Sequence, residues 1–227
     1  MKRLSDWCGD NFSGGRITEL SVYKGDTYKL ELEGGQTFFI NCAIVADYDL
    51  HEGGEMDAEL LEKLQHADKM RKAKKRALYL LGSRMYSYNE LYKKLLPTYG
   101  EEASRAAADA MQEYGYIDDA DYAGKLAEKL IHGKHYGMSK TRWEMQSRGL
   151  DKNLIEDILA EYTDDEIDEE IMRLLRTKYA EKLSDPDDRR RTVAALARRG
   201  YSYGAVKRCL EAALADEEDF DPDEFEE

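Results

Sequence analysis

Apolar and polar residues alternate near the N-terminus, whereas apolar residues recur every three or four positions along the rest of the chain. Alternation is typical of a half-buried strand, and the longer period is typical of an amphipathic helix. Glycine-containing turn signals at residues 24–26 and 33–35 separate the alternating segments. The sequence therefore predicts a three-stranded antiparallel β element capped by a helix. Its strands span residues 17–23, 28–33 and 37–43, and its helix spans residues 56–70.

From Arg71 onward the pattern is helical throughout, and it contains an internal repeat of roughly 50 residues. Aligned on Gly149 and Gly200, each copy has a helix that ends in Arg-Gly and an apolar residue after it. Asp151 or Ser202 comes next and can cap the following helix, which suits a tight turn between helices. A period of this length predicts a stacked array of helical units.

The predicted fold class is therefore mainly α, with tandem three-helix repeats that form an elongated array after the small β element. The predicted divisions of the chain are residues 1–70 for the β meander and its helix, 71–117, 118–163 and 164–215 for helical repeats 1, 2 and 3, and 216–227 for a disordered acidic tail.

Charge is unevenly distributed along the chain. Its 34 Lys and Arg against 48 Asp and Glu give a formal net charge of −14, which by itself disfavours a nucleic-acid binder. Counted by segment, residues 1–70 carry −7, residues 71–215 carry +2 and residues 216–227 carry −9. The acidic excess thus lies at the two ends, and the helical array between them keeps basic clusters that can meet an anionic surface.

The cysteines Cys8, Cys42 and Cys209 are scattered and lack Cys-x-x-Cys spacing, so the sequence predicts neither a disulfide framework nor a zinc site. There is no apolar run long enough for a signal peptide or a membrane-spanning helix. We expect a cytoplasmic protein that contacts no membrane and uses no cofactor.

A series of short motifs follows in order along the helical array. They are Tyr114-Gly115-Tyr116-Ile117-Asp118-Asp119, Tyr122-Ala123, Gly137 before a helix containing Arg142, Arg148-Gly149-Leu150, and Leu196-Ala197-Arg198-Arg199-Gly200-Tyr201-Ser202-Tyr203. In this order the motifs resemble the RecX regulatory proteins of bacterial recombination, and the resemblance covers the array from about Arg71 to Leu214. Trp143 and Met145 depart from the family, which usually has smaller aliphatic residues at these places.

The resemblance implies a non-enzymatic modulator of the RecA recombinase. Such a protein would bind the RecA filament on single-stranded DNA and limit filament extension, ATPase activity and strand exchange. We expect it to act as a monomer whose contact with single-stranded DNA is weak or indirect. The alternative is a direct DNA-binding protein, because short helix-turn-helix pairs also read DNA and this array carries arginine clusters.

Basic side chains are the candidate partner contacts, because arginine forks pair well with carboxylates and phosphates. The competing interpretation is that each merely solvates the outer face of a helix and pairs with a nearby acid. Arg191 and Arg198 are expected to face outward from one helix. The candidates are Arg142, Arg148, Arg189, Arg190, Arg191, Arg198, Arg199 and Lys207.

Two tyrosines near repeat turns, Tyr136 and Tyr201, are possible aromatic contacts with a partner. In contrast, Tyr114, Tyr116 and Tyr122 are expected to bury their rings at helix corners and to leave only the hydroxyls wet.

His132 and His135 could share a metal ion by their spacing, but no carboxylate or thiol nearby in the sequence completes a ligand set, so a pair of helix-end histidines is favoured. Asp118, Asp119 and Asp121 precede a helix, where carboxylates cap amide groups. We therefore predict no metal site and no catalytic residue.

Overall fold

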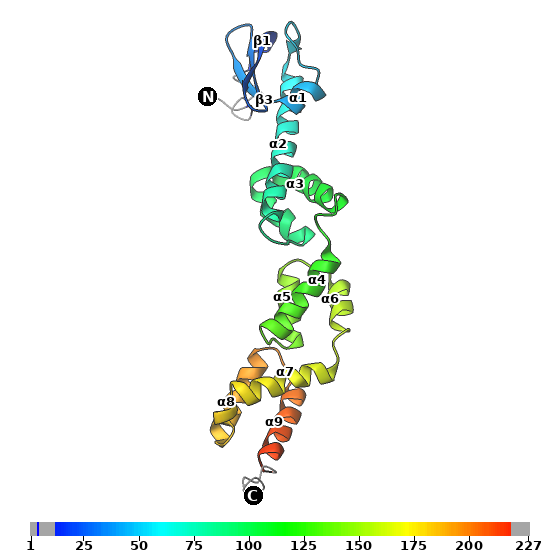
Figure 1. The fold of residues 1–227 in the computed structure, drawn as a ribbon. Coiled ribbons are helices and arrows are strands. Elements are labelled where there is room, and N and C mark those ends of the chain that lie inside the picture. Colours follow the sequence, from blue (N-terminus) through cyan, green and yellow to red (C-terminus); the bar gives the residue numbers. More distant parts are fainter. Residues whose placement is uncertain (1–3, 5–11, 219–227) are drawn as a thin grey trace, which may run out of the picture. The chain divides into compact units, whose positions relative to one another are not determined.

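The computed structural model describes Leu4 and residues 12–218. The fold is mainly helical with a small antiparallel sheet at the N-terminus, as predicted (Figure 1). The chain divides into two compact units, each of which is described by itself. The first unit contains residues 1–84 and 91–116, and the second contains residues 85–90 and 117–227.

The sheet of the first unit has four strands in the order β3-β2-β1-β4, so the predicted number of three was one too low. Leu30 in the middle of β2 lies opposite Leu20 on β1 and Phe38 on β3. β4 was missed because two residues cannot display an alternating pattern. The strands are β1 (Gly15–Lys24), β2 (Thr27–Leu32), β3 (Thr37–Asn41) and β4 (Glu55–Met56).

The face of the sheet that carries Leu30 and Phe38 is buried in a core that includes Leu64 from the following helix. A short helix, α1 (Cys42–Asp47), begins where the third strand was predicted to continue. The reason is local, since the side chain of Asn41 accepts a hydrogen bond from the Ala43 amide and caps the helix.

Two long helices complete the first unit and lead into the second. α2 (Ala58–Leu81) is capped by Asp57 and continues without a break across residue 70, where the sequence predicts a boundary. α3 (Tyr88–Glu113) is two helical segments separated by a kink at Gly100, whose φ of 73° is the left-handed conformation that glycine tolerates. The predicted boundaries between repeats stay predictions.

The second unit consists of six α-helices in its described residues, together with a π-helical turn and a 3₁₀ turn. Their apolar faces form one core, which includes Leu130, Met145, Ile155, Ile171 and Val206. The helices are α4 (Asp119–Glu128), α5 (Met138–Ser147), α6 (Lys152–Leu159), α7 (Asp164–Thr177), α8 (Pro186–Arg198) and α9 (Tyr203–Glu218); the π turn is Lys129–Gly133 and the 3₁₀ turn is Ala180–Lys182.

Polar side chains begin most of these helices. The predicted caps are present at Asp151 on α6 and at Ser202, whose hydroxyl accepts from the Ala205 amide in α9. In α5, by contrast, the N-cap is Gly137, and Ser139 lies inside the first turn. α9 continues to Glu218, three residues into the predicted acidic tail, and residues 219–227 lie outside the described part of the chain.

Candidate partner-binding surface

The Arg-Gly corner that ends α5 contacts the start of α3, and we call this contact the first joint. The Ser87 hydroxyl donates to the carbonyl of Arg148 at 2.5 Å, and the Asn89 side-chain amide donates to the carbonyl of Gly149 at 2.7 Å. Gly149 has a φ of 76°, as expected for a glycine that ends a helix. The carbonyls at the helix end are therefore satisfied by side chains from the neighbouring helix start.

Aspartates of α4 complete the first joint. Asp119 accepts a hydrogen bond from the Tyr88 amide at 2.8 Å, and burial raises the pKa of its carboxyl. Asp118 accepts from two amides in the first turn of α4 and is the N-cap. Both carboxylates therefore satisfy main-chain amides, which agrees with the predicted capping role.

The Arg-Gly corner that ends α8 makes an equivalent contact with the start of α5, which we call the second joint. The amide of Gly137 donates to the carbonyl of Arg199 at 2.8 Å, and the amide of Ser139 donates to the carbonyl of Gly200 at 3.2 Å. A Cβ atom built on Gly137 would lie 2.4 Å from the backbone of Gly200. The two backbones thus approach closely enough to require glycine at position 137.

At both joints the arginine side chain is used within the protein. The guanidinium of Arg148 donates to the Tyr122 hydroxyl at 3.0 Å. Arg199 donates to the carbonyls of Lys134 and His135, at 3.0 Å and 3.3 Å. Both side chains are half-buried. Arg148 and Arg199 therefore help to hold the two joints together, whether or not they also contact a partner.

A buried carboxylate next to the second joint holds two histidines. Glu170 of α7 lies with its two oxygens 2.9 Å from Nδ1 of His132 and 2.6 Å from Nδ1 of His135. Burial alone would raise the pKa of Glu170, but the hydrogen bonds from both histidines outweigh burial and hold the pKa below its ordinary value. The histidine pair is therefore a structural contact that joins the π turn and the residues just after it to α7.

Sequence reasoning missed Glu170, although a signal existed. It lies on the apolar stripe of α7, three residues after Ile167 and four before Leu174. A carboxylate inside such a stripe must find a buried partner. Identifying the two histidines as that partner required the fold, because they lie more than thirty positions earlier in the chain.

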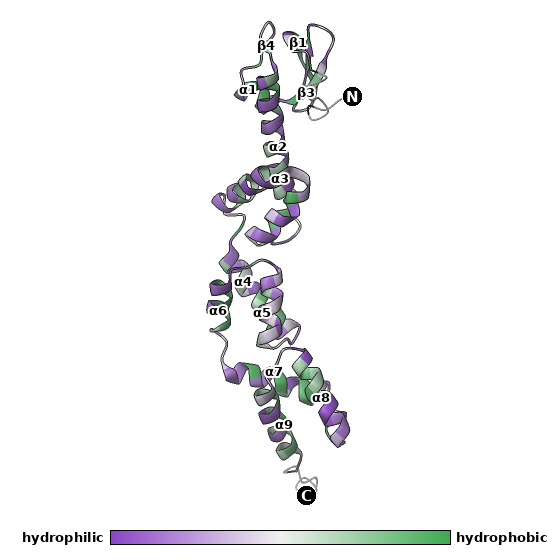
Figure 2. Ribbon diagram, turned by 180° about the vertical axis from the view of Figure 1, so that it is seen from behind, coloured by the Kyte–Doolittle hydropathy of each residue, from purple (hydrophilic) through white to green (hydrophobic). Residues whose placement is uncertain are grey.

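Two of the three consecutive arginines of α8 pair with acids on their own helix. Arg190 lies 3.4 Å from Asp187, and Arg191 lies 2.8 Å from Asp188. Arg189 donates to the carbonyl of Ser184 instead. The three arginines lie in the first part of α8 along the chain, which is hydrophilic, and the stretch after them is mainly apolar (Figure 2). Pairing with local acids makes Arg190 and Arg191 less available to a partner, although Arg191 is exposed, as predicted.

Two further candidates also have acidic partners. Arg142 makes a bidentate contact with Glu156 of α6, with distances of 2.7 Å and 2.9 Å. This pairing lowers the pKa of Glu156 through the hydrogen bond and the positive charge. Lys207 lies 3.6 Å from Glu211 one helical turn away. The contacts of Arg142 and Lys207 therefore match the competing interpretation, in which a basic side chain pairs with a nearby acid of the same protein.

Around the second joint, in contrast, lie four cations that have no carboxylate partner among the described residues. We call Lys134, Lys140, Arg198 and Arg199 the joint cations. The ammonium groups of Lys134 and Lys140 lie 5.6 Å and 4.2 Å from the centre of the Tyr136 ring. Lys134 and Lys140 are not among the residues that the sequence singled out.

The aromatic candidates differ in exposure. Tyr136 is half-buried beneath the lysines, whereas Tyr201 is buried in the core, so Tyr201 is not available as a surface contact. Burial raises the pKa of the Tyr201 hydroxyl. The expectation of a buried ring is confirmed for Tyr122 but wrong for Tyr114 and Tyr116, which are 61% and 58% exposed and stack edge to face on each other.

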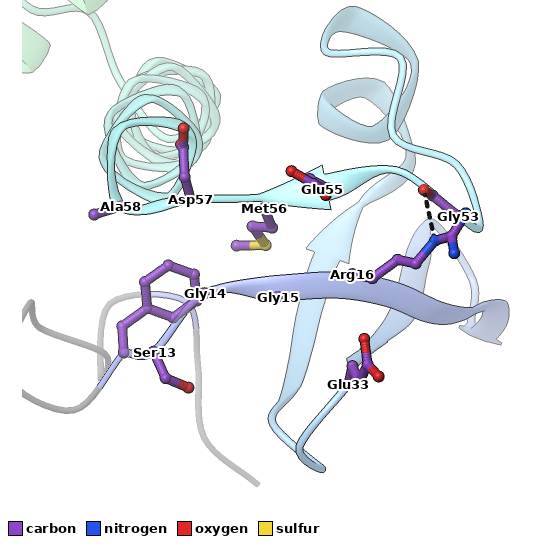
Figure 3. Close-up of a pocket in the computed structure, with 11 residues that line it drawn as sticks. Ser13, Gly14, Gly15, Arg16, Glu33, Gly53, Glu55, Met56, Asp57 and Ala58 are labelled. Atoms are coloured by element: carbon purple, nitrogen blue, oxygen red, sulfur yellow. Dashed lines mark hydrogen bonds between the residues drawn. The ribbon is translucent and has the colours of Figure 1, made fainter.

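In the first unit, a cavity of about 780 Å³ opens between the start of β1, β4 and the start of α2 (Figure 3). Its rim carries Arg16, which donates to the carbonyl of Gly53 at 3.1 Å, and the acids Glu33, Glu55 and Asp57. Asp57 is already occupied as the cap of α2. The cavity thus results from strand pairing and helix capping, and its described polar side chains do not converge on a common point where a ligand could bind.

Among Leu4 and residues 12–218, no set of three or more His, Cys, Asp or Glu side chains is arranged to hold a metal ion. Over the same residues, no helix combines the length and the apolar character needed to cross a bilayer.

The fold and its repeated joints define a helical-repeat protein with a small N-terminal sheet, and comparisons with known proteins agree. Residues 164–210 match the model of the third three-helix domain of RecX. The chain is 28% identical over 211 residues to the regulatory protein RecX of Leuconostoc citreum, covering 88% of this chain and 77% of that protein. The RecX of Clostridium botulinum strain Alaska E43 is 25% identical over 88% of this chain and 96% of its own length.

Solved structures show the same fold. A crystal structure of regulatory protein RecX superimposes with a TM-score of 0.69 at 22% identity, covering 85% of this chain and 98% of that chain. RecX from Lactobacillus salivarius superimposes with a TM-score of 0.59 at 21% identity, covering 64% and 97%. The chain is thus similar in sequence to regulatory proteins named RecX and shares the fold of two solved RecX structures.

Proposed function

We propose that this protein is a non-enzymatic, cytoplasmic and monomeric regulator that binds the RecA filament on single-stranded DNA and limits its extension, ATPase activity and strand exchange. Similarity to regulatory proteins named RecX over most of the chain supports this proposal. The single observation that carries it is the group of joint cations, because four positive charges that have no carboxylate partner among the described residues favour an anionic surface outside the molecule.

The joint cations also support a location for the proposed contact. Arg198 is exposed and is the last residue of α8, whereas Arg190 and Arg191 lie earlier in the same helix, beside their own acids. A partner that approaches α8 must compete with Asp187 and Asp188 for the latter pair. The end of α8 nearest the second joint is therefore the better contact surface.

A charge-neutralisation experiment tests this function. Combining Lys134→Gln, Lys140→Gln and Arg198→Gln should raise the protein concentration needed to inhibit the DNA-dependent ATPase of RecA. The matched control is Arg190→Gln with Arg191→Gln on the same helix, which should inhibit nearly as well as the unmodified chain.

If both variants lost the same amount of inhibition, the contact surface would have to include Arg190 and Arg191. No inhibition by the unmodified protein, and no co-sedimentation with RecA filaments, would contradict the proposed function itself. Circular dichroism of both variants verifies that the helices remain folded.

A further inference from the structure

The loop that joins the π turn to α5 is held in one conformation by its neighbours. His135 has a φ of 52°, a left-handed backbone conformation that is uncommon for residues other than glycine. Its Nδ1 lies 2.6 Å from a carboxylate oxygen of Glu170, and its carbonyl accepts from Arg199 at 3.3 Å. Such a conformation persists only where the surroundings impose it. The next residue, Tyr136, is therefore presented at a defined place.

Two lysines from different elements place their ammonium groups over the Tyr136 ring. The distance to the ring centre is 5.6 Å for Lys134, which lies in the loop, and 4.2 Å for Lys140, in the first turn of α5. Both distances are within the roughly 6 Å over which an aromatic ring attracts a cation. No acid among the described residues pairs with either lysine. The ring thus offsets the repulsion between the two positive charges.

The main chain of each lysine is fixed at the second joint. The Lys134 carbonyl accepts from Arg199 at 3.0 Å. The Lys140 backbone lies against Gly200, where an added Cβ atom would be 2.4 Å from the Lys140 amide nitrogen. Only the two side chains remain to be ordered. A lysine side chain loses rotamer freedom when it binds, and ordering it beforehand lowers the cost of binding.

We propose that Tyr136 is a positioning residue, which orders the ammonium groups of Lys134 and Lys140 over its ring before a partner binds. The inference rests on the proposed function, because it concerns the cations that would meet the partner. Tyr136 itself is half-buried and makes no contact with the partner under this proposal. A fixed pair of cations favours a partner surface that carries negative charge.

Nuclear magnetic resonance tests the ordering without RecA. Protons above the face of an aromatic ring resonate upfield. The side-chain methylene protons of Lys140 should therefore lie upfield of those of an exposed lysine such as Lys152. Tyr136→Leu keeps the apolar bulk without the ring and should abolish this shift, whereas Tyr136→Phe should retain it. Equal positions for the two lysines in the unmodified chain would overturn the proposal.

Inhibition of the DNA-dependent ATPase of RecA tests the role of the ordered pair. Tyr136→Leu should raise the protein concentration needed for inhibition by about fivefold, and Tyr136→Phe should inhibit like the unmodified chain. The matched control is Tyr79→Leu in the first unit, which removes a 70% exposed tyrosine whose ring centre lies 4.9 Å from the guanidinium carbon of Arg76. This control should leave inhibition unchanged. Circular dichroism verifies that each variant is folded.

A combined variant separates positioning from direct contact. In a chain that already carries Lys134→Gln and Lys140→Gln, Tyr136→Leu should cause no further loss of inhibition. A further loss in that chain would mean that the ring contacts the partner directly. Unchanged inhibition by Tyr136→Leu alone would mean that the ordering is not used, and either result overturns the proposal. Absence of inhibition by the unmodified chain would instead contradict the proposed function, so the two failures are distinguishable.

Discussion

The two joints of the second unit place equivalent residues in contact, yet they make their hydrogen bonds with different groups. In both, the carbonyls of an Arg-Gly corner accept. The donors are the side chains of Ser87 and Asn89 in the first joint and the main-chain amides of Gly137 and Ser139 in the second. A main-chain donor brings two backbones closer than a side-chain donor does. The corner glycine is needed at both joints, because a Cβ atom on Gly149 would lie 2.7 Å from the Asn89 Cβ atom and one on Gly200 would lie 2.4 Å from the Lys140 amide nitrogen. The helix start facing the corner differs, since it carries a side chain at Ser87 in the first joint and requires glycine at Gly137 in the second.

The second joint also carries more polar chemistry than the first. Beside it lie the buried carboxylate of Glu170, its two histidines and the joint cations. The first joint contains aspartates that satisfy amide groups. This contrast is why we propose the second joint, and not the first, as the surface for partners.

The largest expected effect comes from adding a methyl group at the second joint. Gly200→Ala places a Cβ atom 2.4 Å from the Lys140 amide nitrogen and requires alanine to adopt a φ of 92°. Gly137→Ala meets the Gly200 backbone at 2.4 Å. Each should lower the free energy of unfolding by about 3 kcal/mol or more, because backbone atoms must move. Urea unfolding followed by circular dichroism measures this change.

Gly204→Ala is the matched control for these variants. Gly204 lies in α9 and has open space around its missing side chain. Alanine there should be neutral or stabilise the protein by up to about 1 kcal/mol. If Gly200→Ala were as harmless as Gly204→Ala, the close approach of the backbones at the second joint would be wrong.

An intermediate effect is expected at Glu170. In Glu170→Gln, one carboxylate oxygen becomes an amide that faces a histidine nitrogen which had been a donor, and the negative charge is lost. We expect a loss of about 2 kcal/mol in the free energy of unfolding at neutral pH.

The pH dependence of stability gives a second measurement for the same residue. The pKa of Glu170 is lower in the folded protein than its ordinary value of 4.5. Its contribution is therefore fully present above that value and is lost as the pH falls through the folded pKa. Unfolding curves of the unmodified protein should show the free energy of unfolding falling at acid pH. The curves of Glu170→Gln should show a smaller fall. Identical acid profiles would contradict the role of the carboxylate.

A smaller effect is expected at the first joint. Ser87→Ala removes the donor to the Arg148 carbonyl and the cap that accepts from the Glu90 amide. The expected cost is about 1 to 1.5 kcal/mol, typical of a lost helix cap with its buried hydrogen bond. Thermal unfolding should place this variant between the unmodified chain and Gly137→Ala. A cost as large as that of Gly137→Ala would remove the distinction between the joints.

Local chemistry explains how much of the fold the sequence could predict. Turn glycines and alternation located three strands, and the Arg-Gly corners with Asp151 and Ser202 located the repeated helix turns. These features depend on neighbours along the chain. β4 could not be predicted, because a two-residue strand exists only through its pairing with Gly15 and Arg16. The exposure of Tyr114 and Tyr116 was likewise decided by packing.

The candidate surface was predicted less well than the fold. Sequence reasoning selected arginines for their clustering, but the acids of α8 lie one turn from Arg190 and Arg191 and pair with them. Lys134 and Lys140 were passed over because nothing in their local sequence distinguishes them. Their lack of acidic partners became visible only in the structure.

The sequence by itself determined that this protein is a helical-repeat chain with a small β element, with its acidic excess at the two ends, because periodicity, capping and charge are local or additive properties. Only the tertiary structure decided which charges remain available. Packing brought Glu170 to two histidines and set Gly137 against Gly200, and within the described part of the chain it left the joint cations without an acidic partner. Burial and pairing depend on residues distant in the chain, and that information appears only once the helices are folded together.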